Sequence, residues 1–302
     1  MMPPLLREPA VRRLLPAIAT VVVIALAAGV VIGRLVGDVT VGPAPEGEPE
    51  AAADGHIHMH GGDGGGDTSG STVTGQSVSA GGYTLVPDDN VFELGSETLF
   101  GFHIADGNGV PVTEYMVQHE KRMHLFAMRL DMSGYQHVHP DMSDDGTWAI
   151  ELDFTRPGPW RVIADFVVDG ADPVPLTLGV DVTVPGDYQP ADLPEATNPD
   201  VVADYDVTLD FVPSVQVSSP LLLTVQADGG AVELEPYLGA YGHLVVLRSG
   251  DLGFLHVHPD SERIGDALRF WTTLPSAGDY RLFFEFQVDG RVQRAEFTLN
   301  VD

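Results

Sequence analysis

Cysteine is absent from this sequence of 302 residues, and lysine occurs once, at Lys121. A chain without cysteine has no disulfide bonds, thiolate zinc sites, iron–sulfur clusters or thiol nucleophile. Basic residues are scarce, because 15 Lys and Arg residues stand against 44 Asp and Glu residues and give a formal net charge of −29. This charge repels phosphate backbones, so we expect no nucleic-acid partner. Adaptation to high salt is the alternative explanation of the acidity.

Long apolar runs are equally rare, and one is prominent, at residues 14–36, with Arg34 as its only charged residue. A helix that spans a bilayer needs about 20 such residues. Three arginines lie within residues 1–13 and acidic sequence follows the run, which predicts a cytoplasmic N-terminus. We therefore predict a single-pass anchor in the cell membrane, with the rest of the chain outside the cytoplasm. A signal peptide cleaved near residues 25–27 is the alternative.

Large apolar residues are also scarce between residues 37 and 80, where Gly, Pro, Ser, Thr, Ala and acidic residues dominate. Such a segment cannot bury enough surface to offset the entropy lost on ordering, so we predict a flexible, disordered tether. Within it, His56, His58 and His60 surround Met59 and form a short tract that is a weaker candidate for metal capture. A neutral linker composition explains the tract equally well.

The remaining sequence contains an internal repeat. The block HLFAMRLDMSGYQHVHPD at residues 124–141 returns as HLVVLRSGDLGFLHVHPD at residues 243–260, which is 119 positions later. Further matches lie on both sides of this block. They define two copies of one domain, at residues 81–186 and 203–302, joined by a Pro- and Asp-rich linker at 187–202.

Short alternating runs of apolar and polar residues recur in each copy, separated by turn signals such as Asp106-Gly107 and Asp169-Gly170. Several short strands at this spacing predict an all-β fold made of two tandem immunoglobulin-like antiparallel β-sandwiches. We expect the equivalent Trp160 and Tyr280 to lie near the start of a late strand in each copy and to pack on its core.

Three histidines follow the pattern H-x12-H-x-H in each copy: His124, His137 and His139 in the first, and His243, His256 and His258 in the second. Histidines two residues apart on a strand project from the same face. If residues 131–134 form a hairpin turn with an even number of residues, the two residue numbers of each facing pair add up to 263. His124 then lies opposite His139. The equivalent sum in the second copy is 501.

Three imidazoles that converge from two adjacent strands suit a copper or zinc ion. A hairpin turn with an odd number of residues would instead place His124 on the opposite face from the other two. Histidines retained by duplication, without any metal, are the other alternative.

The first copy contains further candidate ligands. His119 lies five residues before His124, and Met123 directly precedes it. Thioethers are soft ligands that suit Cu(I). His103 and Met142 are weaker candidates, and any of these methionines can equally fill a gap in the core.

The combination of an anchor, a His/Met tether and β-domains with His-x-His-Pro blocks resembles bacterial extracytoplasmic copper-handling proteins. It is similar in kind to the YtkA-like and CopC-like families, which have immunoglobulin-like folds. The blocks at residues 137–140 and 256–259 are the most specific part of the resemblance. The resemblance implies metal binding outside the cytoplasm, with copper as the metal. Some CopC proteins bind Cu(II) through an N-terminal histidine, which this sequence does not offer unless it is processed.

These observations predict a non-catalytic, membrane-anchored protein that buffers, senses or transfers copper, with a membrane metal transporter as a candidate partner. Two alternatives belong to other functional classes. One is an enzyme, a hydrolase or an oxidase, in which a metal held by three histidines keeps an open position. The other is a structural or adhesive ectodomain that binds no metal.

Overall fold

A computed structural model describes residues 73–255, 257–260 and 263–302. The predicted cytoplasmic segment, the predicted anchor at residues 14–36 and most of the tether lie outside the described residues. Within the described ranges the chain is all-β, with no α-helix. No helix in these ranges is therefore long and apolar enough to cross a membrane.

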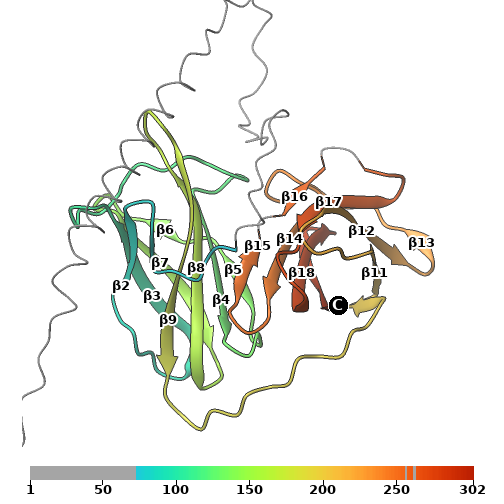
Figure 1. Ribbon diagram of the computed structural model, residues 1–302, viewed down its shortest axis with the longest axis horizontal. Coiled ribbons are helices and arrows are strands. Elements are labelled where there is room, and N and C mark those ends of the chain that lie inside the picture. Colours follow the sequence, from blue (N-terminus) through green and yellow to red (C-terminus); the bar gives the residue numbers. More distant parts are fainter. Residues whose placement is uncertain (1–72, 256, 261–262) are drawn as a thin grey trace, which may run out of the picture. The chain divides into compact units, whose positions relative to one another are not determined.

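The first repeat contains two antiparallel sheets (Figure 1). One sheet has the order β1 (Ser79–Ala80), β2 (Tyr83–Pro87), β3 (Gly95–Ala105), β7 (Thr147–Phe154) and β6 (Asp141–Met142). The other has the order β5 (Gln136–Val138), β4 (Met123–Arg129), β8 (Gly158–Val168) and β9 (Val174–Val184). The inner faces of both sheets contribute to one apolar core.

The second repeat has the same organisation. Its first sheet has the order β10 (Asp200–Val202), β11 (Tyr205–Phe211), β12 (Ser218–Ala227), β17 (Ala267–Thr273) and β16 (His258–Pro259), and β13 (Gly230–Ala231) pairs with β12. Its second sheet has the order β15 (Gly253–Leu255), β14 (His243–Arg248), β18 (Gly278–Val288) and β19 (Arg291–Val301). A separate apolar core lies within this repeat.

The predicted tether and the structured chain overlap by a few residues. Residues 74–80 already make backbone hydrogen bonds: Thr74 pairs with Phe254, and Gly75 donates to the Thr177 carbonyl. Backbone pairing needs no apolar side chain, which is why composition alone placed this stretch in the tether.

Trp160 and Tyr280 occupy equivalent positions near the start of β8 and β18, as predicted, and both side chains are almost completely buried. Trp160 Nε1–H donates to the Arg156 carbonyl, and the Tyr280 hydroxyl donates to the Ser276 carbonyl, each four residues earlier. A buried aromatic side chain with a polar group thus finds its hydrogen-bond partner locally in both repeats.

The hairpins that carry the histidines have the predicted register. Leu125 faces Val138 and Phe126 faces His137, so the facing numbers sum to 263. In the second repeat Val246 faces Leu255, which gives 501. The turn between β4 and β5 is therefore even.

Strand β4 is buried on both faces. Met123, Leu125 and Ala127 point into the core of the first sandwich. Phe126 and Met128, which alternate with them, belong to a third apolar cluster that joins the two repeats. That cluster consists of Phe126, Met128, Met132, Tyr135, Ile163, Val245, Leu247, Leu252, Phe254 and Phe283. By alternation, His124 lies on the face of β4 that is turned toward this contact between the repeats.

Candidate metal centre

The three histidines of the first repeat converge. His124 Nδ1 lies 3.2 Å from His137 Nε2 and 3.2 Å from His139 Nε2. One nitrogen from each ring falls within 4.8 Å of the other two. The sequence predicted this grouping from the hairpin register alone, and within the described residues it is the one such group of three or more histidines and carboxylates.

The spacing of these nitrogens suits a common metal ion. A first-row ion with metal–nitrogen bonds of about 2.0–2.1 Å in tetrahedral geometry separates its ligand nitrogens by about 3.3 Å. The two distances of 3.2 Å at His124 Nδ1 are close to this value. One ion could therefore contact all three rings after small side-chain movements.

Two of the rings have a hydrogen-bond partner on the nitrogen that faces away from the group. His124 Nε2–H donates to the Gln118 carbonyl at 3.0 Å, and His137 Nδ1–H donates to Glu285 Oε2 at 2.7 Å. Because carbonyl and carboxylate oxygens only accept, each of these nitrogens carries the proton. In the neutral rings, His124 Nδ1 and His137 Nε2 therefore present lone pairs to one another, an arrangement that a cation between them would stabilise.

Burial keeps the central ring neutral. His124 is 8% exposed, and its burial, together with the neighbouring His137, lowers its pKa to about 2. Burial also lowers the pKa of His139 to about 3. Both rings are thus unprotonated at neutral pH, which is the state that binds a metal ion.

A tight turn precedes His124. Gln118 and Lys121 exchange both backbone hydrogen bonds, while His119 and Glu120 between them have φ values of 47° and 63°. Two consecutive positive φ values define a turn that usually contains Gly, Asn or Asp. The His119 ring lies 6.1 Å from that of His124 and 5.4 Å from that of His243, measured between ring centroids. His119 is therefore beside the group, between histidines of the two repeats.

The second predicted group is described only in part. His243 Nε2–H donates to the Tyr237 carbonyl at 2.7 Å, and burial lowers the His243 pKa to about 4. His256 lies outside the described residues, as do His56, His58 and His60. The backbone of His258 forms part of β16.

The structure does not bring the other first-repeat candidates to the three histidines. Met123 is 1% exposed and packs in the core of the first sandwich, on the opposite face of β4 from His124. Met142 packs against that same core. His103 pairs with Val86 and Thr147 in the other sheet of the first repeat.

Two acidic residues near the histidines are absent from the sequence-based candidates. Glu285 lies directly opposite His243 on the neighbouring strand, and Asp165 lies directly opposite His124. Burial raises the pKa of Asp165 to about 6, and Glu285 is 7% exposed. Each interrupts an apolar run at equivalent places of the repeat, and this shared charged position is the signal that could have identified them.

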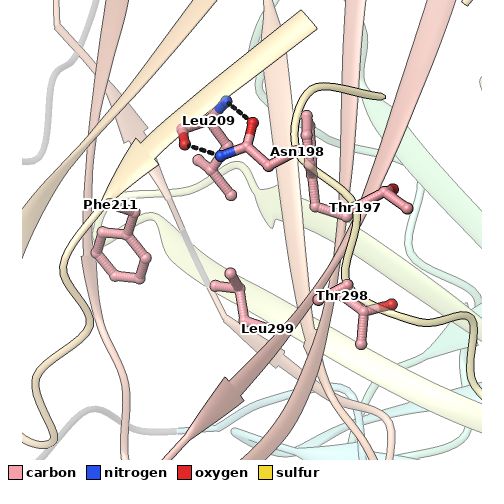
Figure 2. A pocket seen from close by; sticks show the side chains of 8 residues that line it. Thr197, Asn198, Leu209, Phe211, Thr298 and Leu299 are labelled. Carbon is pink, nitrogen blue, oxygen red and sulfur yellow. Dashed lines mark hydrogen bonds between the residues drawn. The ribbon is translucent and has the colours of Figure 1, made fainter. Parts of the chain in front are cut away.

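A pocket elsewhere in the second repeat offers no comparable chemistry. It is lined by linker residues and by strands β11 and β19 (Figure 2). The side-chain amide of Asn198, which lines the pocket, donates from Nδ2 to the Leu209 carbonyl. Its Oδ1 accepts a hydrogen bond from the Leu209 N–H, as Figure 2 shows. Both polar groups of the side chain therefore fasten the linker to β11.

A family described as a domain of unknown function, DUF8832, matches the chain twice, over residues 76–185 and 200–302. The chain belongs to this family. Each match covers one sandwich, so the three converging histidines and their Gln118 partner lie in the first DUF8832 domain, while Glu285 lies in the second. No curated protein matches the chain.

Solved structures similar to the paired DUF8832 domains include two bacterial adhesins. FdeC of Escherichia coli has 16% identity over 75% of this chain and 66% of that chain, with a TM-score of 0.23. InvE of Yersinia pseudotuberculosis has 14% identity over 75% of this chain and 61% of that chain, with a TM-score of 0.21. This chain thus spans less than two thirds of either structure.

Domains 4 and 5 of the S-layer protein SbsC have 12% identity over 74% of this chain and 98% of that chain, with a TM-score of 0.22.

Proposed function

We propose that this protein binds a metal ion through His124, His137 and His139 and acts, without catalysing a reaction, in copper buffering, sensing or transfer. The observation that carries the proposal is the convergence of three imidazole nitrogens, with His124 Nδ1 lying 3.2 Å from each of the other two. A group with this donor set and spacing matches the coordination preferences of copper and zinc.

The hydrogen bonds around the group support a metal site. Metal-binding histidines usually donate their second ring N–H to a carboxylate or a backbone carbonyl, which fixes the ring and its tautomer. His124 and His137 each do so, to Gln118 and to Glu285.

A non-catalytic role is supported by the position of Glu285, the carboxylate that is hydrogen-bonded to one of the three histidines. Glu285 is engaged by His137 Nδ1, on the side of that ring away from the converging nitrogens. A general base for a metal-bound water would instead have to reach the open coordination position. We therefore assign Glu285 the role of orienting His137, one of the proposed ligands.

The location of the protein is part of the proposal. An anchor at residues 14–36 would hold the paired domains outside the cytoplasm at the cell membrane, where a metal transporter is a candidate partner.

The strand orders β2-β3-β7-β6 and β5-β4-β8-β9 correspond to the two sheets of an immunoglobulin-like sandwich, so we infer that fold for each repeat. The second repeat, through His243, His256 and His258, would provide a second site.

Metal content and affinity test this function. The full chain, purified in detergent without a His tag and with His56, His58 and His60 replaced by alanine, is titrated with Cu(I), Cu(II) and Zn(II). We expect one copper ion per complete histidine group, and the His137→Ala variant should lose the ion of the first repeat. His103→Ala is the matched control, because His103 lies in the other sheet of the same repeat.

Three results would contradict the proposal in different ways. Equal binding by the parent chain and His137→Ala would exclude the three histidines as a site. Tight zinc binding without copper binding would replace copper by zinc and favour a search for hydrolase activity. No binding of either metal at micromolar concentration would leave a structural or adhesive ectodomain.

A further inference from the structure

One hydrogen bond at the candidate metal centre connects the two repeats. His137 Nδ1 belongs to the first repeat, and Glu285 Oε2, 2.7 Å away, belongs to the second. Both side chains are nearly inaccessible to solvent, with exposed fractions of 3% and 9%. A buried contact between an imidazole and a carboxylate is strong and depends on direction, because little water competes for it.

The ring of His137 is also held on its flat side. It stacks on Phe126, with ring centroids 4.5 Å apart and an interplanar angle of 25°. Phe126 belongs to the apolar cluster between the repeats and packs on Phe254 of the second repeat, with centroids 5.3 Å apart. The orientation of His137 therefore depends on the second repeat in two ways, through Glu285 and through the packing behind Phe126.

The equivalent carboxylate of the first repeat, Asp165, is hydrogen-bonded within its own repeat. Asp165 lies opposite His124 just as Glu285 lies opposite His243. Asp165 instead accepts a hydrogen bond from Thr177 of the neighbouring strand in its own sheet. The longer side chain of Glu285 reaches the histidine of the other repeat.

We propose that the second repeat completes the metal centre of the first, with Glu285 as the positioning residue for His137, so that metal binding and the docking of the two repeats strengthen each other. This inference rests on the proposed function, because it concerns the same three histidines. Thermodynamic linkage requires the effect to be mutual: if docking raises metal affinity by some factor, bound metal favours docking by that factor.

Metal affinity of Glu285 variants tests the proposal. The background is the full chain without the three tether histidines and with His256→Ala, so that the first repeat holds the intact histidine group. Cu(I) is supplied from a competing chelator. We expect Glu285→Gln, which loses the charge, and Glu285→Asp, which shortens the reach, to bind Cu(I) about 10–100 times more weakly.

Glu151→Gln is the matched control, because Glu151 has an exposed side chain on β7, in the other sheet of the first repeat, away from the contact between the repeats. Its Cu(I) affinity should stay within about twofold of the background. Unchanged affinity in both Glu285 variants would overturn the inference while leaving the proposed function intact. If His137→Ala bound Cu(I) as tightly as the background, the proposed function would fail and the inference with it.

A second measurement separates orientation of the ring from a general loss of structure. The Nδ1 proton of His137 gives an imidazole 1H–15N NMR signal, which we expect to be slowed in exchange and shifted downfield by Glu285. Glu285→Asp should lose this signature while the amide spectrum of the first repeat's core is retained. A retained signature in Glu285→Asp would contradict the assigned contact.

The mutual effect is measured by hydrogen exchange in the same background. Loading the first repeat with Cu(I) should slow exchange in β14 and β18 of the second repeat, and this slowing should be reduced in Glu285→Gln. Slowing confined to the first repeat would contradict linkage between the repeats.

Discussion

His124 and His243 lie near the start of equivalent strands, and the backbone around them is similar in the two repeats. Each ring donates from Nε2 to the carbonyl six residues earlier, in Gln118 and Tyr237. Each histidine also lies opposite an acidic residue on the next strand. The duplication has thus kept the frame of the site in both halves.

The halves differ in the side chains attached to that frame. In the first repeat the acidic residue is Asp165, which bonds within its own sheet, and in the second it is Glu285, which bonds to His137 of the other repeat. A difference of one methylene group separates a local contact from one that joins two domains. Equivalent backbones therefore do not imply equivalent surroundings for the two histidine groups.

Acidification should give the largest difference in stability between the two repeats. The folded-state pKa values of His124 and His139 are lowered to about 2 and about 3, whereas in an unfolded chain both would titrate near 6.5. Below that value the unfolded chain binds more protons, so the stability of the metal-free protein is complete above about pH 6.5 and falls as the pH decreases toward the folded values.

A buried group such as His124 contributes up to about 1.4 kcal/mol per pH unit in this window, and the more exposed His139 contributes less. The second repeat has His243 as its described group of this kind, with a pKa lowered to about 4. Asp165 of the first repeat opposes this loss, because its raised pKa of about 6 lets the folded state take up a proton before the unfolded chain does. In an Asp165→Asn variant, which removes that opposing group, we expect urea unfolding at pH 7, 6 and 5, followed by the NMR signals of each core, to show the larger loss in the first repeat. Equal losses in both repeats would contradict this.

Removal of the large aromatic residue near the start of the late strand should affect both repeats alike. Trp160 and Tyr280 are 1% and 0% exposed, and replacing such a side chain by alanine costs about 3–5 kcal/mol. The midpoint of urea unfolding measures this cost. Trp160→Phe and Tyr280→Phe, which keep most of the volume, should cost only about 1 kcal/mol each. A small cost for one alanine variant alone would show that the cores are not equivalent.

Single histidine replacements test whether the two proposed metal sites are equivalent. His137→Ala should weaken Cu(I) binding in the first repeat by at least about 100-fold, because loss of a ligand exceeds the effect of losing an outer partner. His256→Ala should remove the ion of the second repeat. Isothermal titration of the two variants gives the number of ions that each retains, and a full complement in either variant would exclude that histidine as a ligand.

The turn before each histidine gives the smallest expected effect. Glu120 has a φ of 63°, where the second repeat has Gly239 with a φ of 75°. Because a side chain disfavours this backbone conformation, Glu120→Gly should stabilise the protein by about 0.5–1 kcal/mol. The reciprocal change, Gly239→Ala, should destabilise it by about the same amount. Urea unfolding at pH 7 measures both variants, and destabilisation by Glu120→Gly or stabilisation by Gly239→Ala would contradict the equivalence of the turns.

Sequence patterns were sufficient for the local part of the structure. The spacing of His124, His137 and His139 and an even turn predicted the register that the hairpin adopts, because pairing within a hairpin depends on neighbours in the chain. The role of Glu285 could not be predicted in this way. Its partner lies 148 residues away, and the contact depends on how two separately formed sandwiches pack.

Met123 illustrates a second limit. Its place next to His124 made it a candidate ligand, but adjacent residues on a strand point to opposite faces, and Met123 lies in the core of its sandwich. The predicted anchor and the residues of the tether with His56, His58 and His60 lie outside the described residues, so those predictions remain predictions.

The apolar cluster between the repeats contains residues that correspond to one another in the duplication. Phe126 corresponds to Val245, Met128 to Leu247, and Tyr135 to Phe254. A contact between equivalent surfaces is the arrangement of a twofold-symmetric homodimer. The chain is thus built like a dimer whose subunits have been fused through a linker. A single repeat produced alone would expose this apolar surface, and we expect it to self-associate, with two copies covering each other as the halves of this chain do.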